Sequence, residues 1–298
     1  MQFRFIINPK SGPGKKARNL TEKIADRFGI TDHSWDVVFT SGPGDATRLA
    51  RQAAAEQIAV AVAVGGDGTV NEVASGLIHS ESALGIIPMG SGNGVARSLD
   101  LPLRFKKCLD LLINAEFVHI DAGEINGKYF FGISGMGFDA RIGYKFQHFG
   151  VRGPVPYFII GIREFLRYQP QELLLMTKDR EITIRPLLLA VANTTQYGNG
   201  ALIAPMADPS DGWFEICYLD NSSLLASMRA VARLFRGNID KSTIYHHFRA
   251  QSFEIESRQK ELIVHFDGEP RVMPGKLQVK LHPKALKVAV GREVIVSS

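Results

Sequence analysis

The chain has 298 residues, 45% of them hydrophobic, and a formal net charge of +5. This length is sufficient for two domains with separate cores. The mildly basic balance favours nucleotides, other phosphorylated ligands or an anionic membrane surface over acidic proteins. No block of five or six basic residues and no basic stripe interleaved with aromatic residues occurs, so we expect no nucleic-acid partner.

Cysteine content and hydropathy limit the cellular compartments in which we expect the protein. Only Cys108 and Cys217 are present, far apart in the sequence. They favour neither a disulfide framework nor a cysteine metal site, and they fit a reducing cytoplasm. The first apolar run is too short for a signal peptide, and no run reaches the ~20 apolar residues of a membrane span. We therefore expect a cytoplasmic protein whose contact with membranes is at most peripheral.

The first 122 residues show a pattern typical of a parallel α/β sheet. Short apolar runs predict strands, and amphipathic segments between them predict helices. Strand and helix alternate along the chain, which predicts parallel strands with crossover helices. The expected strands are 3–7, 35–39, 58–63 and 83–87, and the expected helices are 17–28, 45–57 (capped by Asp45), 71–78 and 101–113.

A glycine turn follows the strand 58–63 and leads into a helix. Gly65, Gly66 and Gly68 allow a sharp turn whose N–H groups approach an anion, and the next helix adds its positive end. Asp67 is the one acidic side chain of the turn, so it can hold a magnesium-bound water or accept a proton from a hydroxyl. The alternative is a tight turn without a ligand. Its place between a strand and a helix favours a nucleotide-phosphate site.

Two other glycine-rich turns follow strand ends. One spans residues 8–16 and carries three lysines. The other contains Gly90, Ser91, Gly92 and Asn93, whose small residues permit close approach to a phosphate while the Ser and Asn side chains add hydrogen bonds. Together these turns predict a phosphate site at the carboxyl edge of the sheet.

Beyond residue 122 the pattern changes to alternating strands separated by turns, with Asn126-Gly127 as a hairpin signal. This predicts a second, mainly antiparallel domain. We place the domains at 1–122 and 123–286, with 287–298 returning to the first as a closing strand. The expected strands are 124–125, 128–133, 173–177, 181–192, 213–219, 252–256, 262–267, 275–281 and 285–290.

Three motifs carry a family resemblance: Asn8-Pro9-Lys10-Ser11-Gly12, the run Gly65–Glu72, and Pro88-x-Gly-Ser-Gly-Asn93. In this order they resemble the diacylglycerol kinase catalytic domain family, which includes sphingosine, ceramide and bacterial lipid kinases. The resemblance extends over the whole chain. It implies a Rossmann-like ATP-binding domain, a C-terminal β-sandwich domain and a cleft between them. It also implies ATP and Mg²⁺ as cofactors and a lipid acceptor at a membrane surface. A homodimer is one possible assembly, and the sequence leaves the oligomeric state open.

The resemblance also assigns roles to residues. Asp267 and Glu269, in an Asp-Gly-Glu motif, are expected beside the ATP phosphates, and either Asp67 or Asp267 is the base for the lipid hydroxyl. A bare Asp-Gly-Glu is otherwise a β-turn. The chain reads Asn93-Gly94-Val95-Ala96 where diacylglycerol-type members have Asn-Asp-Phe-Ala, which is closer to the sphingoid type. The implied nucleotide contacts are Asn8, Ser11, Thr40, Gly66, Asp67, Gly68, Thr69, Glu72, Gly90, Ser91, Gly92, Asn93 and Arg152.

Two further assignments concern the second domain. Asp139 lies in a Gly-Phe-Asp-Ala segment and is expected to contact the lipid headgroup, or alternatively to cap the following helix. Asp211 matches a turn associated with a structural metal in bacterial members, although Ser210 replaces a second aspartate; the alternative is an ordinary hairpin turn. The helix expected at 224–236 is basic and amphipathic, so it either docks on an anionic membrane or packs on the sheet with its arginines in water.

The sequence thus predicts a kinase that transfers the γ-phosphoryl group of ATP to a hydroxyl of a diacylglycerol-like or sphingoid lipid. Two alternatives remain. One is a kinase of the NAD kinase type, which shares Gly65–Thr69. The other is a non-catalytic sensor of lipid or nucleotide on the same fold.

Overall fold

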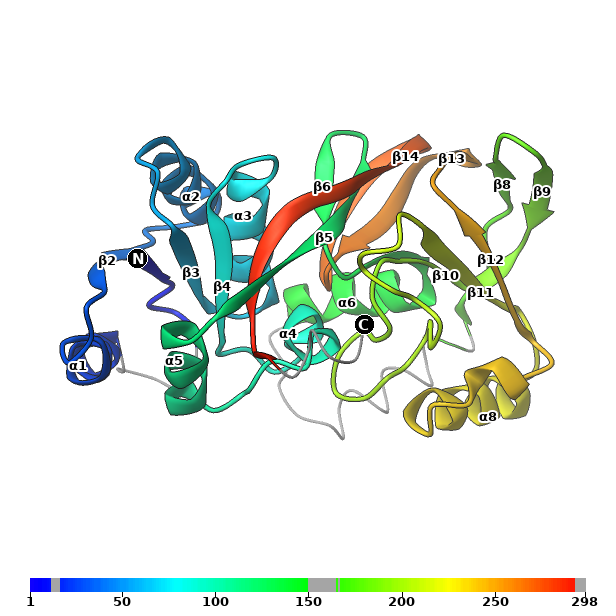
Figure 1. Ribbon diagram of the computed structural model, residues 1–298. Coiled ribbons are helices and arrows are strands. Elements are labelled where there is room, and N and C mark those ends of the chain that lie inside the picture. The colour runs from blue at the N-terminus through cyan, green and yellow to red at the C-terminus, as the bar shows by residue number, and fades with distance from the viewer. Residues whose placement is uncertain (12–16, 150–164, 166, 293–298) are drawn as a thin grey trace. The chain divides into compact units, whose positions relative to one another are not determined.

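The computed structural model describes residues 1–11, 17–149, 165 and 167–292 (Figure 1). Contacts within the chain divide it into two compact units. Unit 1 comprises residues 1–122 and 282–298, and unit 2 comprises residues 123–281. Among the described residues, no helix combines the length and apolarity needed to cross a membrane.

Unit 1 is built on a parallel sheet. Its strands are β1 (Gln2–Ile7), β2 (Ser34–Phe39), β3 (Val60–Gly65), β4 (Ala83–Pro88) and the end of β14 (Glu269–Val290). They lie in the order β14-β4-β3-β1-β2, and each neighbouring pair is parallel. Every residue of β3 and β4 is buried, as expected for strands covered on both faces. The predicted α/β class is confirmed.

Helices cover the sheet of unit 1 on both faces (Figure 1). The helices are α1 (Ala17–Phe28), α2 (Asp45–Ala55), α3 (Asp67–Leu77), α4 (Gly94–Ser98) and α5 (Phe105–Ile113). Helices α1 and α5 pack their apolar sides into one core with Phe3, Phe5 and Val62 of the sheet. Helices α2 and α3 pack against each other, and Gly76 allows this because a Cβ there would lie 2.6 Å from the Cβ of Ala50.

Three helix starts differ from the sequence-based expectation. Helix α3 begins at Asp67 rather than at residue 71, so most of the glycine motif forms its first turn. Helix α5 begins at Phe105, after Pro102 and an extended Arg104. Helix α2 is capped by Gly44 in the left-handed conformation, not by Asp45. The Asp45 carboxylate instead accepts the Ser41 backbone N–H at 2.9 Å.

Unit 2 is a mainly antiparallel β structure. Neighbouring strands follow the order β12-β11-β10-β7-β13-β14, β8 pairs with β13 and β9, and β5 forms a hairpin with β6. The strands are β5 (Glu116–Ile125), β6 (Lys128–Phe130), β7 (Ile133–Gly137), β8 (Leu173–Met176), β9 (Glu181–Ile184), β10 (Pro186–Ala192), β11 (Phe214–Asp220), β12 (Tyr245–Ala250) and β13 (Ser252–Phe266), joined by the first part of β14.

Strand β10 of unit 2 is buried on both of its faces. Leu189 and Val191 belong to one core cluster, whereas Leu188 and Ala190 belong to another. This is the period of two that a strand imposes on its side chains. Helix α8 (Leu224–Phe235) and the short helix η1 (Ile239–Lys241) cover the second cluster, and α6 (Phe138–Phe149) follows β7.

Strand boundaries in unit 2 were predicted less well than strand existence. The expected strand 181–192 is two strands, because Arg185 separates β9 from β10 and Pro186 begins the second one. The two expected strands within 252–267 are one strand whose register shifts between Glu256 and Glu261. The hairpin predicted at Asn126-Gly127 is present, and both residues have positive φ, as a type I′ turn requires.

Candidate functional site

Two glycine turns meet backbone to backbone at the carboxyl edge of the unit 1 sheet. Gly65, at the end of β3, pairs with Pro88, at the end of β4. A Cβ on Gly90 would lie 2.9 Å from the Cα of Gly66, closer than real Cβ contacts. Gly90 is therefore required for the approach, and the sequence-predicted residues Gly66 and Gly90 are brought together.

Asp67 holds these two turns in place. Its Oδ2 accepts the Asn93 backbone N–H and its Oδ1 accepts that of Gly94, both at 2.8 Å. Burial raises the pKa of Asp67 above its ordinary value, and the amide donors of Asn93 and Gly94 oppose that rise. A Cβ on Gly92 would lie 2.9 Å from Oδ2, so a larger residue there would displace the carboxylate. Both oxygens of Asp67 thus already accept one hydrogen bond each.

The second turn is closed by the Asn93 side chain. Asn93 has φ near 53°, and its amide donates to the Gly90 carbonyl at 2.9 Å while its Oδ1 accepts the Gly90 N–H at 3.0 Å. Arg97 donates from Nε to the Gly92 carbonyl at 3.0 Å. Ser91 is exposed at the tip. The side chain predicted to contact a nucleotide therefore shapes the turn that presents Ser91 and Gly92.

The turn after β1 reaches the same edge. Asn8 donates from Nδ2 to the Thr69 hydroxyl of α3 at 3.1 Å, and its Oδ1 accepts the Lys10 N–H at 3.0 Å. Its backbone carbonyl accepts the Ser11 N–H at 3.1 Å. Thr40, after β2, is buried beside this turn and donates its N–H to the Ile7 carbonyl at 3.0 Å. Parallel strands thus bring the predicted residues of all these turns to one edge.

The amino end of α3 opens at this edge. The first intrahelical hydrogen bond runs from the Val70 N–H to the Gly66 carbonyl, so the N–H groups of Asp67, Gly68 and Thr69 lie ahead of the helical ladder. Such amides and the helix dipole favour negative charge. These N–H groups form an arrangement that can bind a phosphate mainly through the backbone.

Glu72, predicted as a nucleotide contact, binds backbone amides at the amino end of α2 in the structure. Its Oε1 accepts the Gly44 N–H at 2.8 Å and its Oε2 accepts the Ala46 N–H at 3.2 Å. The Thr47 hydroxyl also donates to the Glu72 carbonyl at 2.9 Å. Glu72 therefore joins α3 to the amino end of α2, which no side chain of its own segment caps.

We expect Glu72→Ala to lower the free energy of unfolding by ~1–2 kcal/mol, because the α2 amides lose their acceptor. Urea denaturation measures this, with Glu22→Ala on the exposed side of α1 as the matched control. A variant with unchanged stability and weakened ATP binding would instead support the direct nucleotide contact.

Asp267 of unit 2 lies in the turn of the β13–β14 hairpin, and its side chain binds the segment that leads into β7. Asp267 and Gly268 both have positive φ and form the two-residue turn between Phe266 and Glu269. The turn predicted as the alternative for this motif is therefore present, and Glu269 is exposed at the start of β14.

The Asp267 carboxylate serves three backbone donors. Its Oδ1 accepts the N–H groups of Gly132 at 2.7 Å and Ile133 at 3.1 Å, and its Oδ2 accepts that of Phe131 at 3.0 Å. Its own N–H donates to the Ile133 carbonyl at 3.0 Å. Asp267 is thus a structural residue of unit 2, whatever further role it has.

Asp139 lies in the first turn of α6 within a polar network. Its Oδ2 accepts the Tyr197 hydroxyl at 3.1 Å and lies 3.2 Å from Nε2 of His265. The Gly268 N–H points to Nδ1 of His265 at 3.4 Å, which fits a His265 ring whose Nε2–H is directed at Asp139. Burial, and then the charge of Asp139, raise the pKa of Tyr197 well above its ordinary value, so this hydroxyl remains a donor.

The second carboxylate oxygen of Asp139 takes no part in this network. Asp139 Oδ1 is buried and has no hydrogen-bond partner among the described residues. The sequence predicts a role for Asp139 but none for His265 or Tyr197. His265 stands in the motif next to Phe266 and could have been noticed as a polar residue in a buried strand, whereas nothing in the sequence marks Tyr197.

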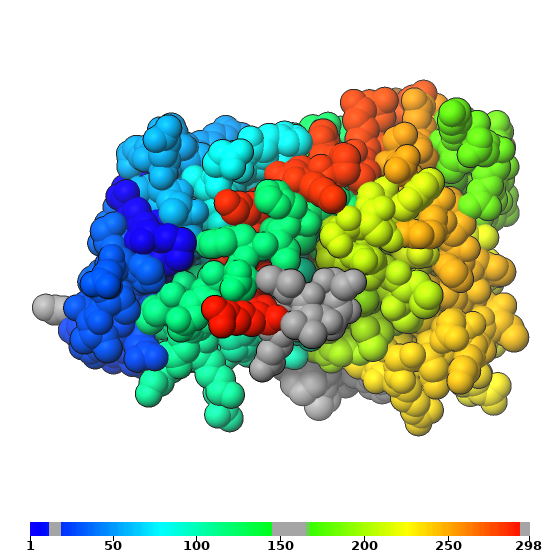
Figure 2. Space-filling model, viewed as in Figure 1, coloured from blue at the N-terminus to red at the C-terminus, as the bar shows by residue number. Residues whose placement is uncertain are grey.

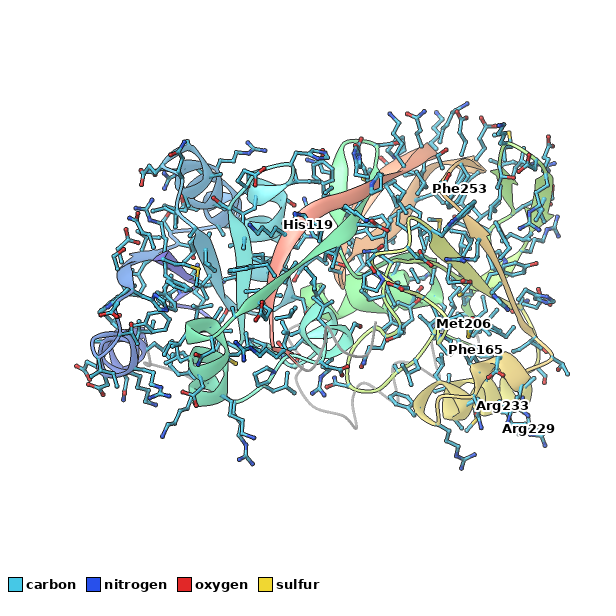
Figure 3. All side chains as sticks on the ribbon, in the orientation of Figure 1. His119, Phe165, Met206, Arg229, Arg233 and Phe253 are labelled. Carbon is cyan, nitrogen blue, oxygen red and sulfur yellow. The ribbon has the colours of Figure 1, made fainter. Side chains whose placement is uncertain are left out.

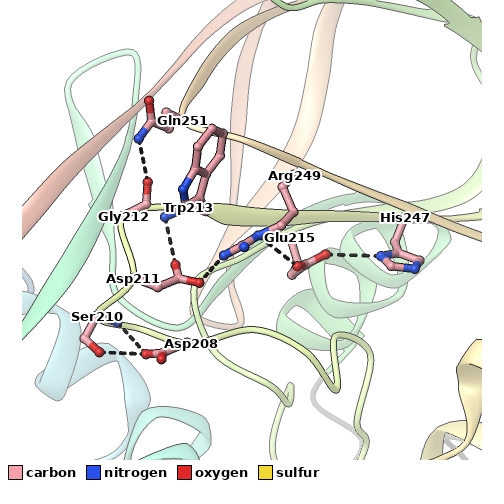
Figure 4. A network of polar contacts seen from close by, with 9 residues as sticks. All are labelled: Asp208, Ser210, Asp211, Gly212, Trp213, Glu215, His247, Arg249 and Gln251. Carbon is pink, nitrogen blue, oxygen red and sulfur yellow. Dashed lines mark hydrogen bonds and ion pairs between the residues drawn. The ribbon is translucent and has the colours of Figure 1, made fainter. Parts of the chain in front are cut away.

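Asp211 is part of an ion-pair network on β11 and β12 (Figure 4). Its Oδ1 accepts the Trp213 N–H at 2.9 Å and its Oδ2 pairs with Arg249. Arg249 also lies 3.2 Å from the buried carboxylate of Glu215, whose other oxygen contacts His247. Arg249 therefore pairs with the carboxylate oxygens of Asp211 and Glu215 that the expected metal ion would need as ligands. In the described part of the chain, no group of three potential ligands is arranged for a metal.

We expect unit 2 to unfold at the same urea concentration with and without EDTA, because Arg249 already neutralises Asp211. Trp213 fluorescence in a Trp35→Phe background reports this transition, and Arg249→Ala is the comparison. That variant leaves Glu215 buried without its arginine, and we expect a loss of ~2–4 kcal/mol in unfolding free energy. A midpoint lowered by EDTA in the unsubstituted protein would support the metal assignment.

Arg152, predicted as a phosphate ligand, lies outside the described residues. Each of the other predicted site residues belongs to one of the two units. Those of unit 1 lie in the turns after β1, β2, β3 and β4 and in α3. In unit 2, Asp267 and Glu269 lie at the β13–β14 hairpin and Asp139 contacts His265, whereas Asp211 belongs to the network with Arg249.

Comparisons with known proteins agree over nearly the whole chain. Residues 2–125 match the diacylglycerol kinase catalytic domain, and residues 132–290 match the YegS C-terminal NAD kinase β-sandwich-like domain. A protein of Chromohalobacter salexigens named a probable YegS-like lipid kinase is 30% identical, covering 92% of this chain and 91% of its own. The diacylglycerol kinase of Bacillus subtilis is 29% identical, with the same coverage of each chain.

Solved structures show the same fold. A diacylglycerol kinase from Bacillus anthracis superposes with a TM-score of 0.73 at 22% identity, and a second structure from that organism reaches 0.79; each comparison covers 98% of both chains. Likeness at this identity supports the two-domain fold alone. With the domain matches and the relatives above, it shows that the chain belongs to the family of diacylglycerol kinases and YegS-like lipid kinases.

Proposed function

We propose that the protein is an ATP-dependent lipid kinase, which transfers the γ-phosphoryl group of ATP to a hydroxyl of a lipid. The observation that carries the proposal is the approach of Gly66 and Gly90 beside the amino end of α3, in a chain of this family. Kinases must hold and neutralise a polyphosphate, and this edge offers backbone donors without bulky side chains.

The residues present fit the phosphates of ATP. A Cβ at Gly90 would meet the Gly66 backbone, so glycine is what allows the two turns to lie against each other beside the amino end of α3. The N–H groups of Gly68 and Thr69 would donate to phosphate oxygens, and Ser91 would add a hydroxyl. Asp67 positions the second turn through Asn93 and Gly94 and so keeps this phosphate site preorganised.

The carboxylates also fit Mg²⁺, which would spread the charge of the transferred phosphoryl group. This ion is usually held by substrate phosphates, waters and one or two carboxylates, so a dedicated cluster of protein ligands is not needed. Each oxygen of Asp67 accepts one amide and keeps further acceptor capacity, which a metal-bound water can use.

We propose that either Asp67 or Asp267 is the base for the lipid hydroxyl. Both carboxylates are held rigidly by backbone amides, so either can present a fixed lone pair to a hydroxyl. Glu269, exposed after the hairpin, is proposed to contribute charge beside the phosphates. The acceptor lipid is proposed to be of the diacylglycerol or sphingoid type, with Asp139 contacting its polar headgroup.

The test is transfer of labelled γ-phosphate from ATP with Mg²⁺ to a panel of mixed micelles. The panel contains diacylglycerol, sphingosine, ceramide, monoacylglycerol and phosphatidylglycerol, and a parallel reaction contains NAD. We expect label in one lipid, abolished in Asp67→Ala and retained in Gly42→Ala, whose added Cβ meets nothing within 4 Å. Label only in NAD would support an NAD kinase, and ATP binding without transfer would support a sensor.

A further inference from the structure

Helix α8 leaves its largest apolar side chains in water. Ser227, Ala230 and Leu234 form its buried side, and Ala230 and Leu234 pack into a core cluster of unit 2. The outer side carries four large hydrophobic residues that are about half exposed or more: Leu225 at 58%, Met228 at 50%, Val231 at 48% and Phe235 at 60%. Exposed apolar residues elsewhere in the described chain are scattered, whereas these four form one stripe.

The spacing places charge along one border of this stripe. At about 100° of rotation per residue, the four apolar residues fall within an arc of about 120° on the helix surface. The three arginines, Arg229, Arg233 and Arg236, fall within an adjacent arc of about 60°. Figure 3 shows Arg229 and Arg233 projecting from α8, and Figure 2 shows atoms of this helix on the molecular surface.

The arginines of α8 are available for an external anion. The segment Leu224–Phe235 contains no acidic residue. Arg229, Arg233 and Arg236 make no ion pair with another described residue, whereas Arg4, Arg27, Arg185 and Arg249 all do. A helix with an exposed apolar stripe and a cationic border is the pattern of a helix that lies in the plane of a membrane interface.

We propose that the outer face of α8, defined by Leu225, Met228, Val231, Phe235 and the three arginines, docks on an anionic lipid membrane. The apolar stripe enters the boundary of the acyl chains while the arginines reach phosphate headgroups along one side. Charge complementarity selects this occupant over a second copy of the chain, because a second α8 would bring more arginines and no carboxylates.

This surface is connected to the residues around Asp139. The Leu202 N–H donates to the Leu234 carbonyl of α8 at 3.1 Å. Leu202 also forms a bridge with Gln196, next to Tyr197, which packs on the same cluster as α8 and donates to Asp139. The docking face therefore supports the loop that positions a donor to Asp139. The inference rests on the proposed function in one respect, that a lipid acceptor brings the protein to membranes.

The experiment measures co-sedimentation with vesicles in the absence of ATP. We expect at least tenfold tighter partitioning to vesicles of phosphatidylcholine with phosphatidylglycerol than to phosphatidylcholine alone, and weaker binding as salt rises. Leu225→Ser with Phe235→Ser should reduce binding at least tenfold. Arg229→Ala with Arg236→Ala should reduce it about fivefold for each arginine. The matched controls, Ile30→Ser with Val272→Ser and Arg51→Ala with Arg271→Ala, change exposed residues elsewhere and should bind as the unsubstituted protein does.

Two outcomes would overturn the docking surface. One is vesicle binding that both α8 double variants retain in full. The other is a dimer in sedimentation equilibrium that Leu225→Ser with Phe235→Ser dissociates, which would assign the face to a second copy. Phosphorylation of short-chain forms of the panel lipids below their aggregation concentrations separates this from the kinase proposal. All α8 variants should keep that activity within twofold, and its absence from the unsubstituted protein would oppose the kinase proposal instead.

Discussion

Replacing Asp267 with alanine should lower the free energy of unfolding of unit 2 by ~3–6 kcal/mol. Three backbone N–H groups, of Phe131, Gly132 and Ile133, lose a charged acceptor together, and each partly buried donor left unpaired costs ~1–2 kcal/mol. Trp213 lies in unit 2 and Trp35 in unit 1, so urea titrations in a Trp35→Phe background report unit 2 alone.

Glu269→Gln is the control for the Asp267 prediction. It changes a carboxylate two residues away in the same hairpin but leaves the three amide donors satisfied, and we expect a change below ~0.5 kcal/mol, as for an exposed surface position. Asp267→Asn keeps one oxygen for the amides and should fall between the two. If Asp267→Ala unfolds at the same urea concentration as the unsubstituted protein while losing phosphoryl transfer, its role is chemical rather than structural.

Gly90→Ala should remove ATP binding and phosphoryl transfer with a smaller effect on folding. The new methyl group would lie 2.9 Å from the Cα of Gly66, and neither backbone can move without displacing Asp67 or Asn93. We expect kcat/KM to fall at least ~100-fold, because small displacements at a preorganised site are costly. The unfolding free energy should fall by ~1–3 kcal/mol, which is typical of overpacking.

The matched control for Gly90→Ala is Gly42→Ala. Gly42 also lies in a turn at the carboxyl end of a strand, but a Cβ there meets nothing within 4 Å. Isothermal titration with ATP and the labelled-lipid assay should both separate the two variants. Equal ATP affinity in Gly90→Ala and Gly42→Ala would mean that the phosphates bind elsewhere.

The strands and glycine turns of unit 1 could be predicted because their signals are local. Buried runs such as Val60–Gly65 have one interpretation when helices alternate with them, and glycines at strand ends mark turns. The start of α3 was misplaced because glycine disfavours a helix in general. Here Gly68 occupies the first turn, where propensity matters little and the amides are required.

The roles of the acidic residues could not be predicted from their motifs. Asp67, Glu72 and Asp267 each bind backbone N–H groups of segments far away in the sequence. Which amides a carboxylate meets depends on how the chain folds back, and spacing along the sequence does not contain that information. The same applies to Tyr197 and to Arg249, whose contacts with Asp139 and Asp211 join separate elements.

The long strand β14 has a consequence for how the protein forms during synthesis. Residues 269–281 of this strand belong to unit 2, and from His282 the chain returns to unit 1, where Val288 pairs with Leu84 and Ala285 accepts the His79 N–H. The ribosome therefore releases the last sheet strand of unit 1 only after all of unit 2 has been translated. Nascent chains that lack it carry an unpaired edge at β4, a state in which an aggregation-prone strand edge is open. Unit 1, whose synthesis begins first, is therefore completed last. A chain that lacks the end of β14 loses its own C-terminal strand and, with it, one strand of the sheet in the N-terminal unit.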